Sequence, residues 1–217
     1  ISMASTASGA FQDDSPSILS YNDETAYCDG DGTNGHMTTV SGYETLDQRV
    51  GVQRGTYFNS WCHDNFDDGL SFHERSDIKL FGGLFEYNGD GGVRQSNDAL
   101  FNIYQAKARK NGWDSSVGTY GSGFDMVNAP SANRQIGIMN LFQCISEDNR
   151  NGIGIVNGGG AVNAYSCKSR NNSNSEYFAN TGVINSYDCD VENSDPNKYK
   201  ATSSGGVINV KNSTLLV

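Results

Sequence analysis

Proline, basic residues and long apolar runs are all scarce in this sequence. It has 3 Pro in 217 residues, and 15 Lys and Arg against 25 Asp and Glu, for a formal net charge of -10. This charge argues against nucleic acid as a partner, because neutralisation of phosphates by basic side chains supplies most of that affinity. No apolar run approaches the roughly 20 residues of a membrane-spanning helix, so we expect no insertion into a membrane.

Closely spaced cysteine pairs are also missing. The five Cys include no CxxC, so a zinc site is not expected. Three of them, Cys144, Cys167 and Cys189, are separated by 23 and 22 residues. We interpret this column as small buried hydrophobic residues. Disulfides between neighbouring repeats are the alternative, so cysteine usage does not indicate a compartment.

Repetition is the strongest signal in the sequence. An aromatic residue returns at steps of 23, 23, 38, 23 and 22 residues, at Phe58, Phe81, Tyr104, Phe142, Tyr165 and Tyr187. Two positions later comes a small residue: Ser60, Gly83, Ala106, Cys144, Cys167 and Cys189. An Asn follows four or five positions further on, at Asn65, Asn88, Asn111, Asn149, Asn171 or Asn172, and Asn193. A fourth column consists of Asn102, Asn140, Asn163, Asn185 and Asn209.

A fixed period of about 23 residues indicates a solenoid. Within each repeat, apolar and polar residues alternate with the period of 2 that is typical of a strand, and they show no helical period of 3.6. We therefore expect an all-β fold: a right-handed single-stranded parallel β-helix with about 23 residues per rung. Alternation further predicts that Asn185, Tyr187 and Cys189 share one apolar face, while Ser186, Asp188 and Asp190 face solvent. Asn amides are expected to hydrogen-bond from rung to rung. A β-sandwich is the alternative, but it does not need matching side chains at each return.

Three segments are expected along the chain. Residues 1–5 look like a cloning remnant, residues 6–50 form an irregular N-terminal segment or first rungs, and residues 51–217 form the β-helix. The 38-residue step predicts a loop insertion near 112–130, and loops on a rigid scaffold often carry function. Three aromatic residues there, Trp113, Tyr120 and Phe124, are suited to stacking on a sugar ring or, equally, to covering the solenoid wall.

Calcium is the one cofactor that the sequence suggests. An acidic, Gly-rich stretch brings Asp29, Asp31 and Thr33 into the spacing of a calcium loop. An EF-hand loop needs Gly where Asn34 stands and Glu where Val40 stands. An ordinary turn is therefore the alternative to Ca²⁺ binding.

The densest group of polar residues begins at position 65 and continues into the next two rungs. The candidate catalytic residues are His73, Asp67, Asp68, Glu74 and Asp90, and the candidate substrate-binding residues are Arg94, Lys107, Arg109, Trp113 and Tyr120. Because stacked strands lie about 5 Å apart, an imidazole, carboxylates and cations could share one shallow groove. The alternative is a set of solvated charges on a solenoid wall.

Such a mixture suits chemistry on acidic polysaccharides. A lyase or epimerase needs a base to remove the proton next to a sugar carboxylate, and His73 could serve. It also needs a cation to neutralise that carboxylate, a role open to Arg94, Lys107 or Arg109. A hydrolase instead needs paired carboxyl groups flanking the glycosidic bond. Asp67 or Asp68 could form such a pair with Asp90 or Glu74.

The segment 68–74, Asp-Gly-Leu-Ser-Phe-His-Glu, resembles the catalytic rung of secreted mannuronan C5-epimerases and related β-helix carbohydrate-processing proteins. That family has Tyr-Gly-Phe-Asp-Pro-His-Glu, then a strand and an Asn-Gly turn, as at Asn88 in this chain. The resemblance implies His73 and Glu74 at catalytic positions. Asp68 stands where the family has its Tyr, and a Ser stands where it has its Asp. The match covers roughly 30 of 217 residues.

The chain as a whole is similar to phage tailspikes and preneck appendages in its Asn- and Gly-rich rungs and its acidic charge. This resemblance implies a homotrimer on the virion tail that binds, and in many such proteins degrades, a bacterial surface polysaccharide or teichoic acid. The alternatives are a secreted lyase or C5-epimerase acting on a uronate polymer, and a structural solenoid without a ligand. Whether the chain is an enzyme stays open at this point.

Overall fold

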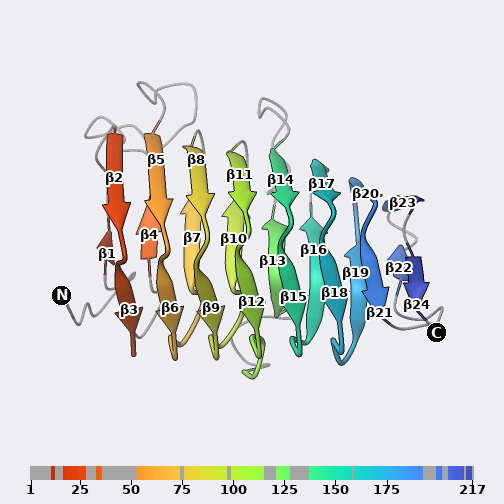
Figure 1. Cartoon of the computed structure of the whole chain (residues 1–217), viewed down its shortest axis with the longest axis horizontal. Coiled ribbons are helices and arrows are strands. Elements are labelled where there is room, and N and C mark those ends of the chain that lie inside the picture. Colours follow the sequence, from red (N-terminus) through yellow and green to blue (C-terminus); the bar gives the residue numbers. More distant parts are fainter. Residues whose placement is uncertain are drawn as a thin grey trace.

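The computed structural model describes residues 11–12, 17–27, 33–35, 53–73, 76–96, 99–114, 121–127, 137–157, 159–192, 199–201, 205–212 and 214–216. These residues form three eight-stranded sheets in which every pairing is parallel, and they contain no helix. Accordingly, they include no helix that could cross a membrane. Each coil contributes one strand to each sheet, and the coils stack along the long axis from the N- to the C-terminal end (Figure 1). The predicted all-β parallel solenoid is confirmed at this level.

Every third strand along the chain belongs to the same sheet. Sheet A contains β1 (Phe11–Gln12), β4 (Thr33–Gly35), β7 (Leu70–His73), β10 (Val93–Ser96), β13 (Ser122–Val127), β16 (Asn151–Asn157), β19 (Ser175–Ala179) and β22 (Tyr199–Ala201). Sheet B contains β2 (Ser17–Tyr21), β5 (Gln53–Phe58), β8 (Ser76–Phe81), β11 (Leu100–Tyr104), β14 (Ile138–Phe142), β17 (Ala161–Tyr165), β20 (Val183–Tyr187) and β23 (Val207–Lys211). Sheet C contains β3 (Glu24–Ala26), β6 (Trp61–His63), β9 (Leu84–Glu86), β12 (Lys107–Arg109), β15 (Ile145–Glu147), β18 (Lys168–Arg170), β21 (Asp190–Glu192) and β24 (Thr214–Leu216).

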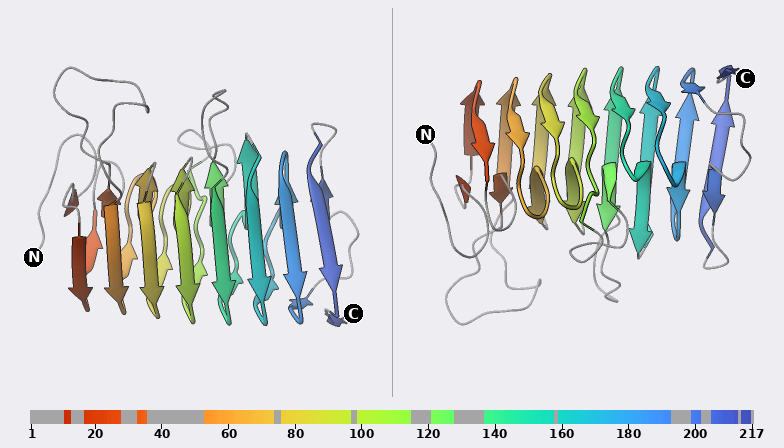
Figure 2. Two further views of the ribbon diagram at one scale, coloured as in Figure 1. Left: turned by 90° about the horizontal axis from the view of Figure 1, so that it is seen from above. Right: turned by 90° about the horizontal axis from the view of Figure 1, so that it is seen from below.

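The strand register confirms the aromatic column. Tyr165 pairs with Tyr187 on one side and with Phe142 on the other. From Tyr21 to Tyr187 the rings lie face to face, with centroids 4.7 to 5.1 Å apart and planes within 13° of parallel. The same strands stay side by side in both views of Figure 2, so the coils stay stacked along the described part of the chain.

Two Asn columns form hydrogen-bonded ladders. The inner ladder, at the corner between sheets C and A, is buried, with amide-to-amide distances of 2.8 to 3.2 Å; its members are Asn65, Asn88, Asn111, Asn149 and Asn172. The outer ladder, on the solvent side of sheet B, has distances of 2.9 to 3.0 Å and consists of Asn102, Asn140, Asn163, Asn185 and Asn209. Both ladders tie each coil to the next through side chains as well as backbone.

One face assignment from the sequence is wrong. Cys189 is fully buried, whereas Tyr187 lies in the partly exposed aromatic column and Ser186, expected to face solvent, is buried. The reason is Asp188, whose φ of 51° turns the chain between strands β20 and β21. The alternation of period 2 therefore restarts after the turn instead of continuing through it. The column of small residues is consequently part of the core, next to side chains such as Val191.

The 38-residue step is absorbed without disturbing sheet B, because Leu100 still pairs with Ile138. Within 112–130, where the sequence predicts an inserted loop, residues 122–127 form strand β13. Phe124 and Met126 on that strand are fully buried, which explains why it joins sheet A. The pairing of Arg94 in β10 with Asp125 in β13 follows from this register.

Candidate functional site

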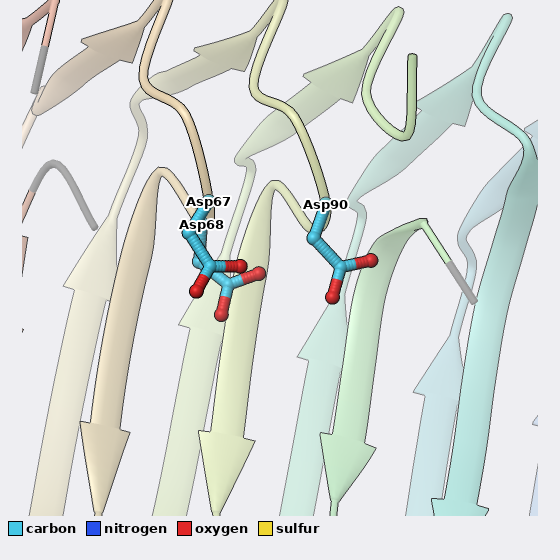
Figure 3. Close-up of side chains that lie close together, drawn as sticks. All are labelled: Asp67, Asp68 and Asp90. Atoms are coloured by element: carbon cyan, nitrogen blue, oxygen red, sulfur yellow. The ribbon is translucent and has the colours of Figure 1, made fainter. Parts of the chain in front are cut away.

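A group of carboxylates lies at the corner between sheets C and A. Asp67 and Asp68 come from one coil and Asp90 from the next, and Figure 3 shows the three side chains gathered at adjacent corners. One oxygen atom from each carboxylate lies within 4.8 Å of the others. The corners are in register because the backbone N–H of Asp90 donates to the carbonyl of Asp67 at 3.0 Å. The structure therefore brings together three of the five predicted catalytic residues.

Arg94 from strand β10 is the cation of this group. Its guanidinium contacts Asp68 at 3.0 Å, Asp90 at 2.6 Å and Asp125 at 2.9 and 3.0 Å. Asp125 was not identified from the sequence, because it follows Arg94 by 31 residues instead of 23. We call the set Asp67, Asp68, Asp90, Arg94 and Asp125 the acidic network. It links three successive coils.

Backbone donors complete the network. The N–H of Gly91 donates to Asp68 at 2.7 Å, and the N–H of Gly121 donates to Asp90 at 2.8 Å. A Cβ on Gly91 would lie only 2.7 Å from an Asp68 carboxylate oxygen, so glycine is needed there for the close approach. Asp68, Asp90 and Asp125 are each at least 97% buried. These three carboxylates are thus enclosed and engaged, as buried charges must be.

The network holds four carboxylates against one guanidinium. Burial raises the pKa of Asp67, and repulsion from Asp90 adds to this, while Arg94 opposes it. Burial likewise raises the pKa of Asp125. Burial alone would lower the pKa of Arg94, but Asp125, Asp68 and Asp90 raise it well above its ordinary value, so it stays charged. One Asp67 oxygen, Oδ1, is buried without a hydrogen-bond partner. A proton on Asp67 would relieve part of the excess negative charge.

A hard cation is the metal that these ligands suit. Oxygen atoms from Asp67, Asp68 and Asp90 are of the type that Ca²⁺ and Mg²⁺ prefer. Arg94, however, already holds a positive charge against Asp68 and Asp90. The residues are therefore at least as well suited to an internal ion network as to a metal.

The other predicted residues lie elsewhere or outside the described residues. Lys107 and Arg109 belong to β12 in sheet C, where Lys107 pairs with Glu147 and Arg109 pairs with Glu86 at 2.7 Å. The structure thus does not place these two cations in one group with Arg94. The backbone of His73 pairs with that of Ser96. The remaining positions, which are the His73 side chain, Glu74, Tyr120, Asp29 and Asp31 and the side chain of Thr33, lie outside the described residues.

Trp113 borders an open groove of about 510 Å³ on the outside of the same corner. The groove is lined by Tyr87, Lys110, Asn111, Gly112, Trp113, Asp148, Asn149, Arg150 and Ser173. The indole N–H of Trp113 donates to the Tyr87 carbonyl at 2.8 Å, while the side chain is 58% exposed. Its ring is thereby held in one place with much of its surface in contact with solvent. We call this the Trp113 groove.

Backbone conformation explains why these side chains gather. Tyr87, Lys110 and Asp148 occupy the same corner position of successive coils, each with φ of 56°. Lys110 Nζ donates to the Tyr87 hydroxyl at 2.8 Å, and this bond raises the pKa of Lys110. Gly112 has φ of 81°, and a Cβ there would lie 2.7 Å from Gly121, so this position of the groove lining requires glycine.

Most of these groove residues were missed from the sequence, although Trp113 was predicted. A signal was present, because Tyr87, Lys110 and Asp148 each directly precede an Asn of the inner ladder. The position before each such Asn must adopt a left-handed conformation to turn the corner, which directs its side chain outwards.

Comparison with protein-family models, curated proteins and solved structures gave no match.

Proposed function

We propose that this chain is a glycan-binding β-helix whose binding site is the Trp113 groove. In this proposal it forms part of a viral tail appendage that holds a bacterial surface polysaccharide or teichoic acid, on a right-handed coil of about 23 residues per rung. The observation that carries the proposal is the exposed indole of Trp113, fixed by its hydrogen bond to Tyr87 beside an open groove. A fixed aromatic surface next to polar groups is typical of sites for small polar ligands.

The aromatic column of sheet B is a poorer platform for sugars, although it contains more rings. Its rings cover one another at spacings of 4.7 to 5.1 Å, so mainly their edges face solvent. A sugar ring stacks on an aromatic face, not on an edge. Trp61 is similarly covered, since its ring stacks on His63 at 4.1 Å. Within the described residues, no ring stacks on Trp113.

The polar lining of the groove supports an anionic glycan. Lys110 is exposed and donates to the Tyr87 hydroxyl, and Arg150 adds a second basic group. Asp148 provides an acceptor for sugar hydroxyl groups on the same wall. The lining comes from four successive coils, so the groove is roughly 14 Å long and can hold more than one sugar ring.

A binding titration tests the proposal. The purified chain is titrated calorimetrically with teichoic acid, alginate and pectate, and we expect at least one to bind. Trp113→Ala should weaken that binding about tenfold or more, as loss of a central aromatic contact does. Trp61→Ala is the matched control, because it removes a Trp from another wall and should leave the affinity unchanged. If none of the three binds, or both variants bind equally well, the groove is not the site.

Hydrolysis is a second candidate function, favoured by one observation. Asp67 is only partly buried, unlike its carboxylate neighbours, and its pKa is raised, as a general acid requires. Bound polymers are followed for new reducing ends, with Asp67→Asn as the variant expected to abolish their release. Unsaturated ends that disappear in His73→Ala would instead support a lyase. If the polymers are bound but not altered, binding is the only function that the experiment supports.

A further inference from the structure

His63 lies between two carboxylates from neighbouring coils. Its Nδ1 is 2.8 Å from Asp64 Oδ2, and its Nε2 is 3.2 Å from Glu24 Oε1. Asp64 directly follows β6 in the same coil, whereas Glu24 belongs to β3 of the preceding coil. His63 is only 8% exposed, with the Trp61 ring stacked on its imidazole at 4.1 Å and the Tyr27 ring meeting it edge-on at 6.0 Å. We call His63, Glu24 and Asp64 the histidine clamp.

The clamp stands where ion pairs of arginine stand further along the same sheet. The residues aligned with His63 on successive strands of sheet C are Glu86, Arg109, Glu147, Arg170 and Glu192. Contacts between these coils are made by Arg109 with Glu86 and by Arg170 with Glu147, both at 2.7 Å. A guanidinium keeps its charge at any ordinary pH, whereas an imidazole changes charge near neutral pH. Within the described part of this column, the contact made by His63 is therefore the one that responds to pH near neutrality.

The strands of the first coil are held from one side only. Within the described residues, β3 is the end strand of sheet C and pairs with β6 alone. Similarly, β2 is the end strand of sheet B and pairs with β5 alone. A terminal repeat of a solenoid contacts one neighbour, so it opens more readily than an interior repeat. A side-chain contact that joins this coil to the next therefore has a large effect on opening.

We propose that the histidine clamp is a pH-sensitive switch, which fastens β2 and β3 to the next coil when His63 is protonated. A protonated imidazole donates from both nitrogens and so satisfies Asp64 and Glu24 together. A neutral imidazole has one N–H, and the shorter contact, to Asp64, retains it. The contact that is lost is then the one with Glu24, which joins the two coils.

The two carboxylates of the clamp favour the protonated form. Burial alone would lower the pKa of His63, but hydrogen bonds to Asp64 and Glu24 and the attraction of both charges raise it above its ordinary value of 6.5. The stability that the clamp adds is fully present below about pH 6.5 and is lost as the pH rises through the raised value. Above that value, β2 and β3 are expected to open more often and to uncover the edges of β5 and β6.

Two other ionisable side chains face the imidazole. Glu86 of β9 is aligned with His63, and its carboxylate is held by Arg109 at 2.7 Å and by the Trp61 indole at 3.1 Å. Tyr27, directly after β3, presents only the edge of its ring. The two carboxylates of the clamp therefore decide the charge of the imidazole. The inference is independent of glycan binding at the Trp113 groove.

Hydrogen–deuterium exchange of the whole chain at about pH 5.5 and pH 8.5 tests the proposal. Protection of residues 17–27, corrected for the intrinsic effect of pH on exchange, should be about tenfold or more greater at the lower pH, as expected for a hydrogen bond between charged groups. Residues 138–142, which form β14 inside the stack, are the internal control and should be protected equally at both pH values. Equal protection of residues 17–27 at the two pH values contradicts the proposal, as does an equal change in both segments.

Three variants separate the two contacts of His63. His63→Gln should abolish the pH dependence of residues 17–27. Glu24→Gln changes an exposed side chain, so the chain is expected to fold, and it should lower protection at pH 5.5 because a neutral amide replaces the carboxylate between the coils.

Asp64→Asn is the matched control for Glu24→Gln. Asn tolerates the left-handed φ of 52° at this position. Its amide can donate to Nδ1 of His63, which leaves the Nε2 proton for Glu24, so protection should stay high at both pH values. A pH dependence that survives His63→Gln overturns the proposal. So does an Asp64→Asn chain that is protected as weakly at pH 5.5 as Glu24→Gln.

Discussion

The acidic network and the Trp113 groove use the same corner of the solenoid in opposite ways. The network is enclosed: Arg94 is bound by three carboxylates, and its side chain is only 14% exposed. The groove is open, and its Trp113 has one anchoring hydrogen bond and a largely exposed ring. A cluster of polar residues in the sequence therefore does not indicate whether those residues lie inside the solenoid or on its outer surface. In this chain, the denser cluster is the one that holds the coils together.

The largest effect that tests this contrast is expected from Arg94→Ala. Removing the guanidinium leaves four carboxylates near one another, three of them fully enclosed, and should lower the free energy of unfolding by about 3–5 kcal/mol. Lys168→Ala is the control, because its ion pair with Asp190 is exposed on both sides and its loss should cost only about 0–1 kcal/mol. Urea unfolding measures both.

A second substitution at Arg94 tests the same prediction. Arg94→Lys retains the charge but loses the two-pronged contact with Asp125, so its stability should lie between those of Arg94→Ala and the wild type. If all three chains unfold at the same urea concentration, the network does not stabilise the corner. Asp67, Asp68 and Asp90 would then be better regarded as a site for a ligand.

The sequence predicts the stacking well because stacking repeats. The aromatic column that contains Tyr165 and Tyr187 and both Asn ladders could be found from spacing alone, because each coil returns the same type of side chain to the same place. The Arg94–Asp125 contact could not, because the inserted residues change the step to 31. Spacing also says nothing of direction at a left-handed corner, which is why Cys189 was placed on the wrong face and Lys110 was missed.

The two Asn ladders repeat the contrast between enclosed and open polar groups with a smaller expected effect. Asn111 is 3% exposed and bonds to its neighbours at 2.9 Å, while Asn163 makes bonds of the same length on the outer surface. Asn111→Ala should cost about 1–3 kcal/mol, because buried amides on both sides lose their partner. Asn163→Ala should cost about 0.5–1.5 kcal/mol, because water can replace the lost bonds.

Thermal unfolding of the two Asn variants side by side gives the comparison. Equal losses would mean that burial does not distinguish the ladders, and that backbone pairing carries the stability of the corner. A larger loss for Asn163→Ala would reverse the assignment of the inner ladder as the stabilising one.

The smallest expected effect concerns the proton on Asp67. Its pKa is raised in the folded chain, mainly by burial, so folding is favoured when this carboxyl is protonated. The resulting stability is fully present below the ordinary pKa of the carboxyl, about 3.8, and is lost as the pH rises through the raised value. Asp67→Asn carries no charge at any pH and should therefore unfold at a higher temperature than the wild type near neutral pH. The difference should shrink as the pH falls towards 4. A constant difference between Asp67→Asn and the wild type across this range would mean that Asp67 titrates alike in the folded and unfolded chains, and that the excess negative charge of the network is balanced in another way.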